Sequence, residues 1–409
     1  MLQSGRTVTS MTTLTAAASN RSTRSLKPGK RLVSGPLGLV LGSTFGTLFS
    51  LYLLVSVTPL YAARAGAGAS GAGLVTGMLL LGTVVAELVS AMATRRFGYR
   101  MVLVTGAVLM GVPALALLSP GSITIVAAIN AVRGFGFGLT TVALAAMTAS
   151  LVPPDRRGEG LGLFGIADTL PGVIALPAGV WLAGHFGYAL VVGLAAATAL
   201  VPVAGFRWLP GRSGQRCALD RSDAAPTTGL IAGLRLGGLR LSLIFAASTV
   251  TAGVVESFLP LAGISGNVAA LGLLVQALTA TITRWWAGRL GDRHGHARLL
   301  IPGLMISAAG MIFMIWLGSP AAVIIGMGLF GAGFGISLNA TFVLMLDSMP
   351  TAAVGTASAL WNLAYDAGYG AGPMLFGVLV GPVGYPIAFA LTGAVMIAAA
   401  PAARTRRTA

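Results

Sequence analysis

The chain has 409 residues, of which 56% are hydrophobic and 9% are charged. About a quarter of the residues of a soluble domain are charged. This composition, with a mean hydropathy of +0.87, therefore excludes an ordinary soluble protein and indicates one that crosses a membrane many times. The net charge of +16 does not indicate nucleic-acid binding, because the cations are scattered over short loops without interleaved aromatic residues.

The apolar segments are long enough to be membrane-spanning helices, which need about 20 residues to cross a hydrocarbon core of ~30 Å. Short polar connections separate one segment from the next. We expect twelve helices, at residues 37–61, 72–93, 101–119, 122–148, 161–183, 188–206, 241–262, 267–290, 299–317, 321–346, 356–380 and 386–402.

The positions of the lysines and arginines predict the orientation. Residues 1–34 contain six of them and no acidic residue, and residues 207–240 contain six more. Because positively charged loops stay on the cytoplasmic side, both termini are predicted to be cytoplasmic. We expect a multi-pass protein of the cell membrane that has membrane lipids as partners. The expected organisation is a tail (1–34), a six-helix bundle (35–206), a linker (207–240), a second six-helix bundle (241–403) and a tail (404–409).

The two halves repeat each other at an offset of 197 residues. A duplicated hydrophobic chain of this kind is typical of secondary transporters whose site lies between the repeats. The matching positions are Arg96 and Arg293, Gly98 and Gly295, Phe137 and Phe334, Gly138 and Gly335, Pro153 and Pro350, Gly158 and Gly355, Gly184 and Gly381, and Tyr188 and Tyr385.

Several kinds of chemistry are not indicated. Cys217 is the only cysteine, so neither an intramolecular disulfide nor a thiolate metal cluster is possible. The three histidines form no metal-ligand set with nearby carboxylates, and no phosphate-binding G-x-x-x-x-G-K-[ST] loop is present. We therefore predict no catalytic residue, no metal, no cofactor and no direct use of ATP.

Residues 288–295 (GRLGDRHG) carry a family resemblance. They resemble the loop signature of the major facilitator superfamily, and residues 91–98 repeat it with Arg95 in place of the usual Asp. The resemblance covers about residues 35–403 and implies an all-α membrane protein of two pseudo-symmetric six-helix bundles around a central cavity, working by alternating access. We expect a gating loop in which Asp292 faces the positive amino end of a neighbouring helix; a solvated turn is the alternative. Its residues are Gly288, Asp292, Arg293, Gly295, Arg96 and Gly98.

Arg133 lies near the middle of its predicted helix. A guanidinium at that depth costs about 2.5 to 3.5 kcal/mol on insertion scales, so it should face water, a carboxylate or backbone carbonyls. Residues 133–138 resemble the arginine-and-glycine motif of many proton-coupled members of the family. We predict a functional role for Arg133, with a buried structural ion pair as the alternative.

Four acidic residues are predicted to lie within helices: Glu87, Asp168, Glu256 and Asp366. Each is unfavourable facing lipid and is therefore a functional candidate. The resemblance places the helix of Glu256 around the central cavity. We expect Glu256 and Asp366 to carry protons, with Arg133 holding whichever carboxylate is deprotonated.

The repeat also pairs charges across the halves. Glu87 and Arg284 are 197 residues apart, and the resemblance places helix two beside helix eleven and helix five beside helix eight. Arg284 should then lie at the depth of Asp168, and Glu87 at the depth of Asp366. We predict a mainly structural ion pair between Asp168 and Arg284 at the interface of the halves.

The predicted cavity lining is aromatic and mostly neutral. Such a surface suits an amphipathic or modestly charged organic solute better than a sugar, although any one aromatic residue can simply be packing. The expected lining residues are Phe45, Phe49, Tyr52, Asn339, Trp361, Asn362 and Tyr365.

These observations together predict a monomeric secondary active transporter of a small organic molecule, coupled to protons. Gly172, Pro177 and Gly179 partly resemble the family's antiporter signature, which favours export. An uptake symporter or a uniporter is the alternative within the class. A membrane receptor or a membrane-embedded enzyme is the alternative outside it.

Overall fold

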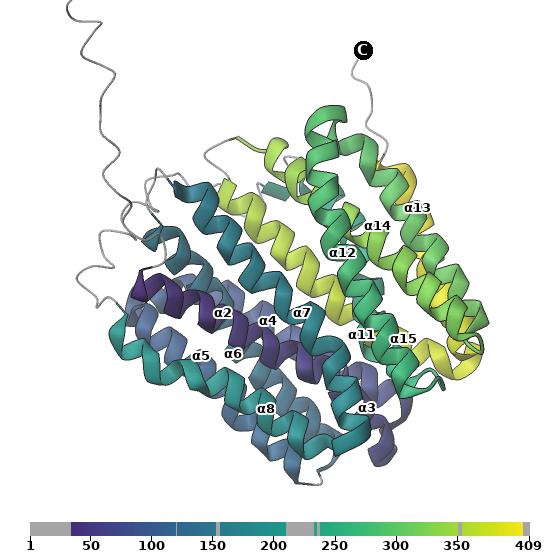
Figure 1. Ribbon diagram of the computed structural model, residues 1–409, viewed down its shortest axis with the longest axis horizontal. Coiled ribbons are helices and arrows are strands. Elements are labelled where there is room, and N and C mark those ends of the chain that lie inside the picture. The colour runs from purple at the N-terminus through teal and green to yellow at the C-terminus, as the bar shows by residue number, and fades with distance from the viewer. Residues whose placement is uncertain are drawn as a thin grey trace, which may run out of the picture. The chain divides into compact units, whose positions relative to one another are not determined.

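The computed structural model describes residues 34–119, 121–152, 156–209, 233–234, 238–350 and 354–403 (Figure 1). The chain divides into two units, Met1–Ser34 and Gly35–Ala409, and the description below concerns the second. Some sequence predictions lie outside the described residues, namely those on residues 1–33 and 404–409, most of the linker 207–240 with Cys217, and Pro153.

Helices make up nearly all of the described residues, and no strand is present among them. The helices of the first half are α2 (Gly35–Val55), α3 (Val57–Ala62), η2 (Ala63–Ala67), α4 (Gly68–Phe97), α5 (Tyr99–Leu115), η3 (Ala116–Leu118), α6 (Ile123–Leu151), α7 (Arg157–Phe186), α8 (Tyr188–Leu200) and η5 (Val201–Trp208). Those of the second half are α11 (Leu239–Phe258), η7 (Leu259–Leu261), α12 (Gly266–His294), α13 (His296–Phe313), η8 (Met314–Trp316), α14 (Pro320–Asp347), α15 (Val354–Ala399) and η10 (Ala400–Ala403).

All twelve predicted segments fall within helical structure, although the described part of the chain has ten continuous apolar stretches long enough to span a membrane. Two of these are double: Gly35–Phe97 has 63 residues and Thr356–Ala403 has 48. A straight helix of 63 residues would be roughly 95 Å long at 1.5 Å per residue. Each double stretch contains glycine at positive φ: Gly66 (89°) and Gly68 (61°) in the first, and Gly384 (77°) in the second. We interpret these glycines as the places where the chain turns back.

The helices pack as two groups. Residues 35–208 pair α4 with α6, α2 with α7 and α5 with both α6 and α8, while residues 239–403 pair α14 with α12 and α13, and α11 with α15. Figure 1 shows the purple-to-teal helices beside the green-to-yellow ones. The halves meet where α4 packs on α15 and α7 on α12. The family resemblance implied the same contacts, with helix two (α4) beside helix eleven (the first part of α15) and helix five (α7) beside helix eight (α12).

Glycines allow the closest helix contacts. A Cβ atom at Gly134 of α6 would collide with the backbone of Leu79 on α4, and one at Gly73 of α4 would collide with the backbone of Pro373 on α15. Small residues at such crossings let two helix backbones approach each other in a membrane. The first contact holds one bundle together, and the second joins the two halves.

We expect Gly134→Ala to lower the melting temperature of the detergent-purified protein, because the added methyl group forces α4 and α6 apart. Overpacking of this kind costs about 1 to 3 kcal/mol. Gly165→Ala is the matched control, since a Cβ at Gly165 meets no atom within 4 Å and alanine favours a helix over glycine by about 1 kcal/mol. Equal melting temperatures for the two variants would contradict the assigned contact.

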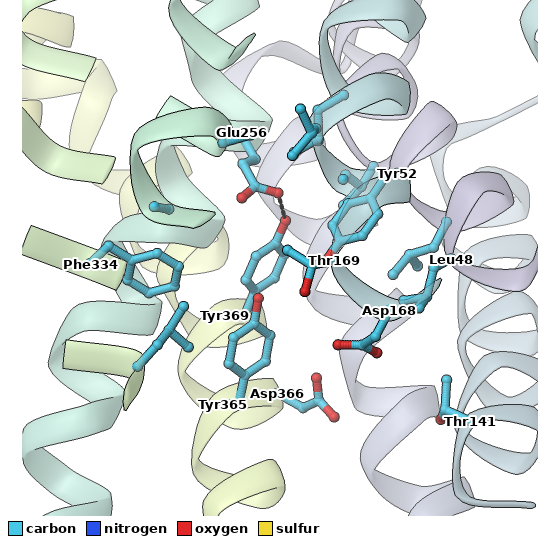
Figure 2. A pocket seen from close by; sticks show the side chains of 18 of the residues that line it. Leu48, Tyr52, Thr141, Asp168, Thr169, Glu256, Phe334, Tyr365, Asp366 and Tyr369 are labelled. Carbon is cyan, nitrogen blue, oxygen red and sulfur yellow. Dashed lines mark hydrogen bonds between the residues drawn. The ribbon is translucent and has the colours of Figure 1, made fainter. Parts of the chain in front are cut away.

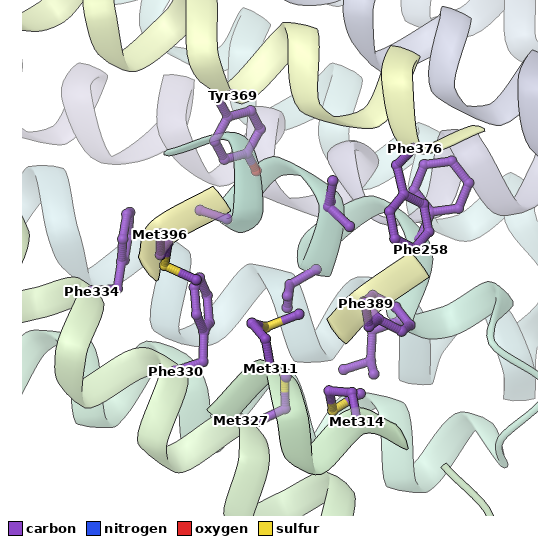
Figure 3. Close-up of a cluster of buried hydrophobic side chains, with 14 of the residues drawn as sticks. Phe258, Met311, Met314, Met327, Phe330, Phe334, Tyr369, Phe376, Phe389 and Met396 are labelled. Atoms are coloured by element: carbon purple, nitrogen blue, oxygen red, sulfur yellow. The ribbon is translucent and has the colours of Figure 1, made fainter. Parts of the chain in front are cut away.

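The core of the second half is rich in methionine and aromatic side chains (Figure 3). Met311, Met314 and Met327 fill the space around Phe330 and Phe389, and all five are fully buried. Phe330 occupies the position 197 residues after Arg133. The place that carries a buried charge in the first half is therefore part of the apolar core in the second.

Candidate functional site

A cavity of about 250 Å³ lies between the two halves (Figure 2). Its walls come from α2, α4, α6 and α7 of the first half and from α11, α12, α14 and α15 of the second. All four acidic residues that were predicted within helices line it, and so does one basic residue. These residues are Glu87, Asp168, Glu256, Asp366 and Arg284.

One wall of the cavity is an aromatic stack, Trp361, Tyr365 and Tyr369, on successive turns of α15. The ring centroids are 6.0 Å apart for Trp361 and Tyr365 and 5.7 Å apart for Tyr365 and Tyr369. Phe245 of α11 supports the stack from behind, 4.7 Å from Trp361. Residues four apart lie on one face of a helix, so aromatic side chains at positions 361, 365 and 369 form one continuous wall.

Glu256 is buried next to the stack. Its side chain is 4% exposed, and its carboxyl group accepts a hydrogen bond from the Tyr369 hydroxyl, marked by the dashed line in Figure 2. It lies one turn before η7, where α11 ends. The neighbouring Ser257 hydrogen-bonds to Thr76 of α4 at 3.1 Å, so this part of α11 touches the other half directly.

Tyr369→Phe is expected to reduce the free energy of unfolding by about 1 kcal/mol, the usual net contribution of one buried hydrogen bond, because the Glu256 carboxyl loses its donor. Thermal unfolding in detergent measures the change. Tyr188→Phe is the control, since the buried Tyr188 hydroxyl has no hydrogen-bond partner and its loss should not destabilise the protein. If both variants unfold alike, the Tyr369 hydroxyl does not stabilise Glu256.

Glu87 and Asp366 form a carboxyl–carboxyl pair across the two halves. Both side chains line the cavity, Glu87 from α4 and Asp366 from α15, and Asp366 is 8% exposed. Close packing of α4 on α15 brings them together, since a Cβ at Gly370 would collide with the side chain of Leu80 and one at Gly77 with that of Met374. Two carboxylates in one cavity repel each other unless a proton or a cation lies between them.

Asp168 on α7 and Arg284 on α12 line the cavity on the opposite interface and attract each other electrostatically. Among the described residues, no nitrogen–oxygen approach within 4.0 Å joins them. The predicted partners are therefore brought to one cavity without a direct salt bridge in this conformation. Figure 2 shows the Asp168 and Asp366 carboxylates directed into the same space.

Arg133 contacts a backbone carbonyl, which is one of the three kinds of partner expected for it, but it contacts no carboxylate of the cavity in this conformation. Arg133 is 1% exposed and is absent from the cavity lining. Its Nε donates to the Met110 carbonyl at 3.3 Å and its Nη1 to Asn130 Oδ1 at 3.1 Å, while Nη2 has no partner. Two of the three guanidinium nitrogens are therefore paired inside the first bundle, with α5 and with its own helix, instead of with a carboxylate of the cavity.

In the predicted gating loop, Asp292 lies beside the amino end of a neighbouring helix and is also exposed to solvent. Gly98 and Gly295 connect helices at φ 81° and 88°, a conformation that favours glycine. The Asp292 side chain is 79% exposed, and its Oδ1 lies 3.9 Å from Nε2 of His296, the first residue of α13. Asp292 therefore lies beside the amino end of the next helix of its own half, where it cannot hold the two halves together. The remaining loop residues, Gly288, Arg293 and Arg96, are not in the cavity lining.

Of the seven predicted lining residues, Tyr52, Trp361, Asn362 and Tyr365 line the cavity, whereas Phe45, Phe49 and Asn339 do not. On α2, Leu48, Leu51, Tyr52 and Val55 line the cavity, while Phe45 and Phe49 stack on each other with ring centroids 5.6 Å apart.

Sequence reasoning missed Gln276. It lies on α12, two turns before Arg284, and it lines the cavity although it is only 2% exposed. Its Oε1 atom has no hydrogen-bond partner. The sequence contains a signal for this residue, because a glutamine within an apolar membrane helix usually hydrogen-bonds to a neighbouring group. Thr141, Thr169 and Thr281 also line the cavity.

Known proteins that are similar to this chain include several MFS-type transporters. The family model of the Major Facilitator Superfamily matches residues 40–265 and 241–408. An uncharacterized MFS-type transporter of Methanocaldococcus jannaschii is 22% identical over 84% of this chain and 90% of its own length. Uncharacterized MFS-type transporters of Bacillus subtilis and Burkholderia mallei are 30% and 34% identical over 36% and 42% of this chain. The matched parts are only 27% and 41% of the lengths of those two relatives.

Solved structures show the same fold at low sequence identity. A bacterial homologue of the human lysosomal transporter Spinster, in an inward-facing and unoccupied conformation, aligns with a TM-score of 0.76 and 15% identity over 92% of this chain and 97% of its own. The xylose transporter XylE from E. coli, in an inward-open conformation, aligns with a TM-score of 0.71 and 16% identity over 89% and 94% of the two chains. A D-xylose-proton symporter also aligns, with a TM-score of 0.68 and 17% identity over 89% and 96%.

Proposed function

Since the chain belongs to the Major Facilitator Superfamily, whose fold is that of a secondary transporter, we propose that it exports a small organic solute in exchange for protons. The observation that carries this proposal is the cavity between the halves, into which four carboxyl groups project. Carboxyl groups inside a membrane mark ion and proton pathways. An aromatic stack beside them suits an amphipathic solute.

The proposed orientation places the end of the helices that carries Arg96 and Arg293 at the cytoplasm, because positively charged loops remain there. At the other end the halves are in contact, through the Thr76–Ser257 hydrogen bond and a 3.2 Å hydrogen bond from the Ser70 hydroxyl to the Gly377 carbonyl. The protein would then be closed to the outside and would take up its substrate from the cytoplasm. We propose that it works as a monomer in the cell membrane with both termini cytoplasmic.

Glu256 and Asp366 are the proposed proton-binding groups. Both are almost completely buried and both line the cavity. Glu256 lies at the closed end, where α11 touches α4 through Ser257. An ionised carboxylate is poorly stabilised in such a place, because a single hydrogen bond replaces its water shell. Closure of the outer end would therefore require Glu256 to be protonated, which links proton binding to the conformational change.

Transport assays in inside-out membrane vesicles test this function. We expect at least one solute, from a panel of dyes, antibiotics and metabolites, to accumulate in the lumen when the lumen is acidic, and a proton ionophore to abolish the accumulation. Accumulation driven only by the opposite gradient would instead identify an uptake symporter. Equilibration of the solute without any dependence on the gradient would identify a uniporter. Either outcome would contradict proton-coupled export.

A further inference from the structure

The charges lining the cavity are unequal. Four carboxyl groups line it, and Arg284 is the only lysine or arginine among the lining residues. Arg284 attracts Asp168, so these two charges balance each other. Arg133, the one fully buried arginine of the described residues, donates to Met110 and Asn130 instead. The protein therefore leaves three carboxyl groups of the cavity without a cation.

Two of these three carboxyl groups form the Glu87–Asp366 pair. The third, Glu256, has Tyr369 as its donor, which satisfies it when it is protonated. The other titratable groups of the lining, besides Asp168 and Arg284, include Tyr52 of α2 and Tyr365 of α15, and a phenol is uncharged near neutral pH because its ordinary pKa is about 10. One proton shared by the pair still leaves one negative charge on it. That charge lies inside the cavity and lacks a counter-ion from the protein.

Aromatic faces lie next to the pair. Tyr365 precedes Asp366 in α15, and Trp361 stands one turn earlier in the same stack. The face of an aromatic ring attracts a cation, most strongly for tryptophan and when water is excluded. An organic cation could therefore contact both a carboxylate and ring faces in one position.

Gln276 provides an independent observation. It is 98% buried, it lines the same cavity, and its Oε1 has no hydrogen-bond partner. An unpaired buried acceptor oxygen is unfavourable by about 1 to 3 kcal/mol. A ligand that supplies positive charge or an N–H group would remove this penalty, whereas an anionic ligand would increase it.

We infer that the substrate is a compact lipophilic organic monocation, held by its charge at Glu87 and Asp366 and by its apolar part at Trp361 and Tyr365. This inference rests on the proposed transport function and narrows it to one class of solute. A cavity of about 250 Å³ suits a molecule of two aromatic rings. Of the two proposed proton-binding groups, Asp366 then binds the cation and a proton in turn, while Glu256 stays free to exchange the proton that drives transport.

Binding of radiolabelled 1-methyl-4-phenylpyridinium to the purified protein tests the inference. Biphenyl-4-carboxylate has nearly the same shape and the opposite charge, so it is the matched competitor. We expect the pyridinium to bind saturably and the carboxylate not to displace it. We also expect Glu87→Gln together with Asp366→Asn to weaken binding at least tenfold. Glu159→Gln, on an exposed residue that pairs with Arg156 at 2.7 Å, should leave binding unchanged.

Each outcome supports or overturns the inference. Displacement by the carboxylate, binding of the carboxylate alone, or no binding of either probe would overturn it. Unchanged binding in the double variant would remove the pair from the site. The wild-type competition needs no variant, so it decides the sign of the charge even if the double variant does not fold. Proton-driven transport of a neutral solute in the vesicle assay would overturn the inference and leave the proposed function intact.

Discussion

Glu256→Gln is expected to abolish substrate accumulation driven by a pH gradient, while leaving substrate binding within about twofold of the wild type. Glutamine keeps the shape and the hydrogen bond to Tyr369 but cannot release a proton. The outer end can then close without proton binding, so substrate equilibrates across the membrane but is not concentrated. Uptake into proteoliposomes with and without a pH gradient, and equilibrium binding in detergent, measure the two effects separately.

The control for this variant is Glu159→Gln, which makes the same chemical change on an exposed side chain outside the cavity. It should accumulate substrate as the wild type does. Gradient-driven accumulation that persists in Glu256→Gln would remove Glu256 from the coupling mechanism. Loss of binding in that variant would make Glu256 a substrate ligand instead.

Asp168→Asn and Arg284→Gln are each expected to lower the rate of transport at least tenfold and to lower the melting temperature. Each change leaves the partner charge in the cavity without compensation, and removing one member of a buried pair is more harmful than removing both. The variant carrying both changes should therefore melt at a higher temperature than either single variant. A melting series of the four proteins, with initial transport rates, measures this interaction.

Thr169→Val offers a control at the neighbouring position, since Thr169 lines the cavity without a charge. It should affect stability less than either charge change. If Asp168→Asn and Arg284→Gln leave both stability and transport untouched, the two side chains form no pair. If the double variant is worse than both single variants, their interaction is not the one described.

The sequence predicted the helices well because each is a long apolar segment, and the 197-residue repeat fixed which helices correspond. That correspondence, with the family resemblance, led to the packing of α4 on α15 and α7 on α12 that the structure shows. It also led to Glu87 being considered with Asp366, and these two side chains line the same cavity. Depth in a membrane can be counted along a helix, so it is accessible to sequence reasoning.

The direction in which a side chain points was harder to predict. Phe45 and Phe49 were expected in the cavity because they are aromatic, yet they stack on each other and are not among its lining residues, although their spacing puts them near the face of α2 that carries Tyr52. α2 is apolar on all sides, so its pattern does not distinguish the face towards lipid or protein from the face towards the cavity. The same difficulty applies to Arg133, whose partners Met110 and Asn130 are a neutral carbonyl and a neutral amide.

The gating loop shows a further limit. Asp292 belongs to a pattern whose interpretation assumes a closed cytoplasmic end, whereas here its side chain is exposed. A sequence specifies every conformation of a transporter at once, and one structure shows the contacts of one of them. Contacts that exist only when the halves close on the other side cannot be found in this arrangement.

Substrate-induced proton movement tests the central claim, exchange of an organic solute for protons, most directly. The protein is reconstituted into liposomes that contain a pH-sensitive dye, and a transported solute is added without an imposed gradient. We predict a change of luminal pH that depends on the solute, that occurs with the wild type and with Glu159→Gln, and that is absent with Glu256→Gln. Movement of the solute through the wild-type protein without any change of luminal pH would contradict the account.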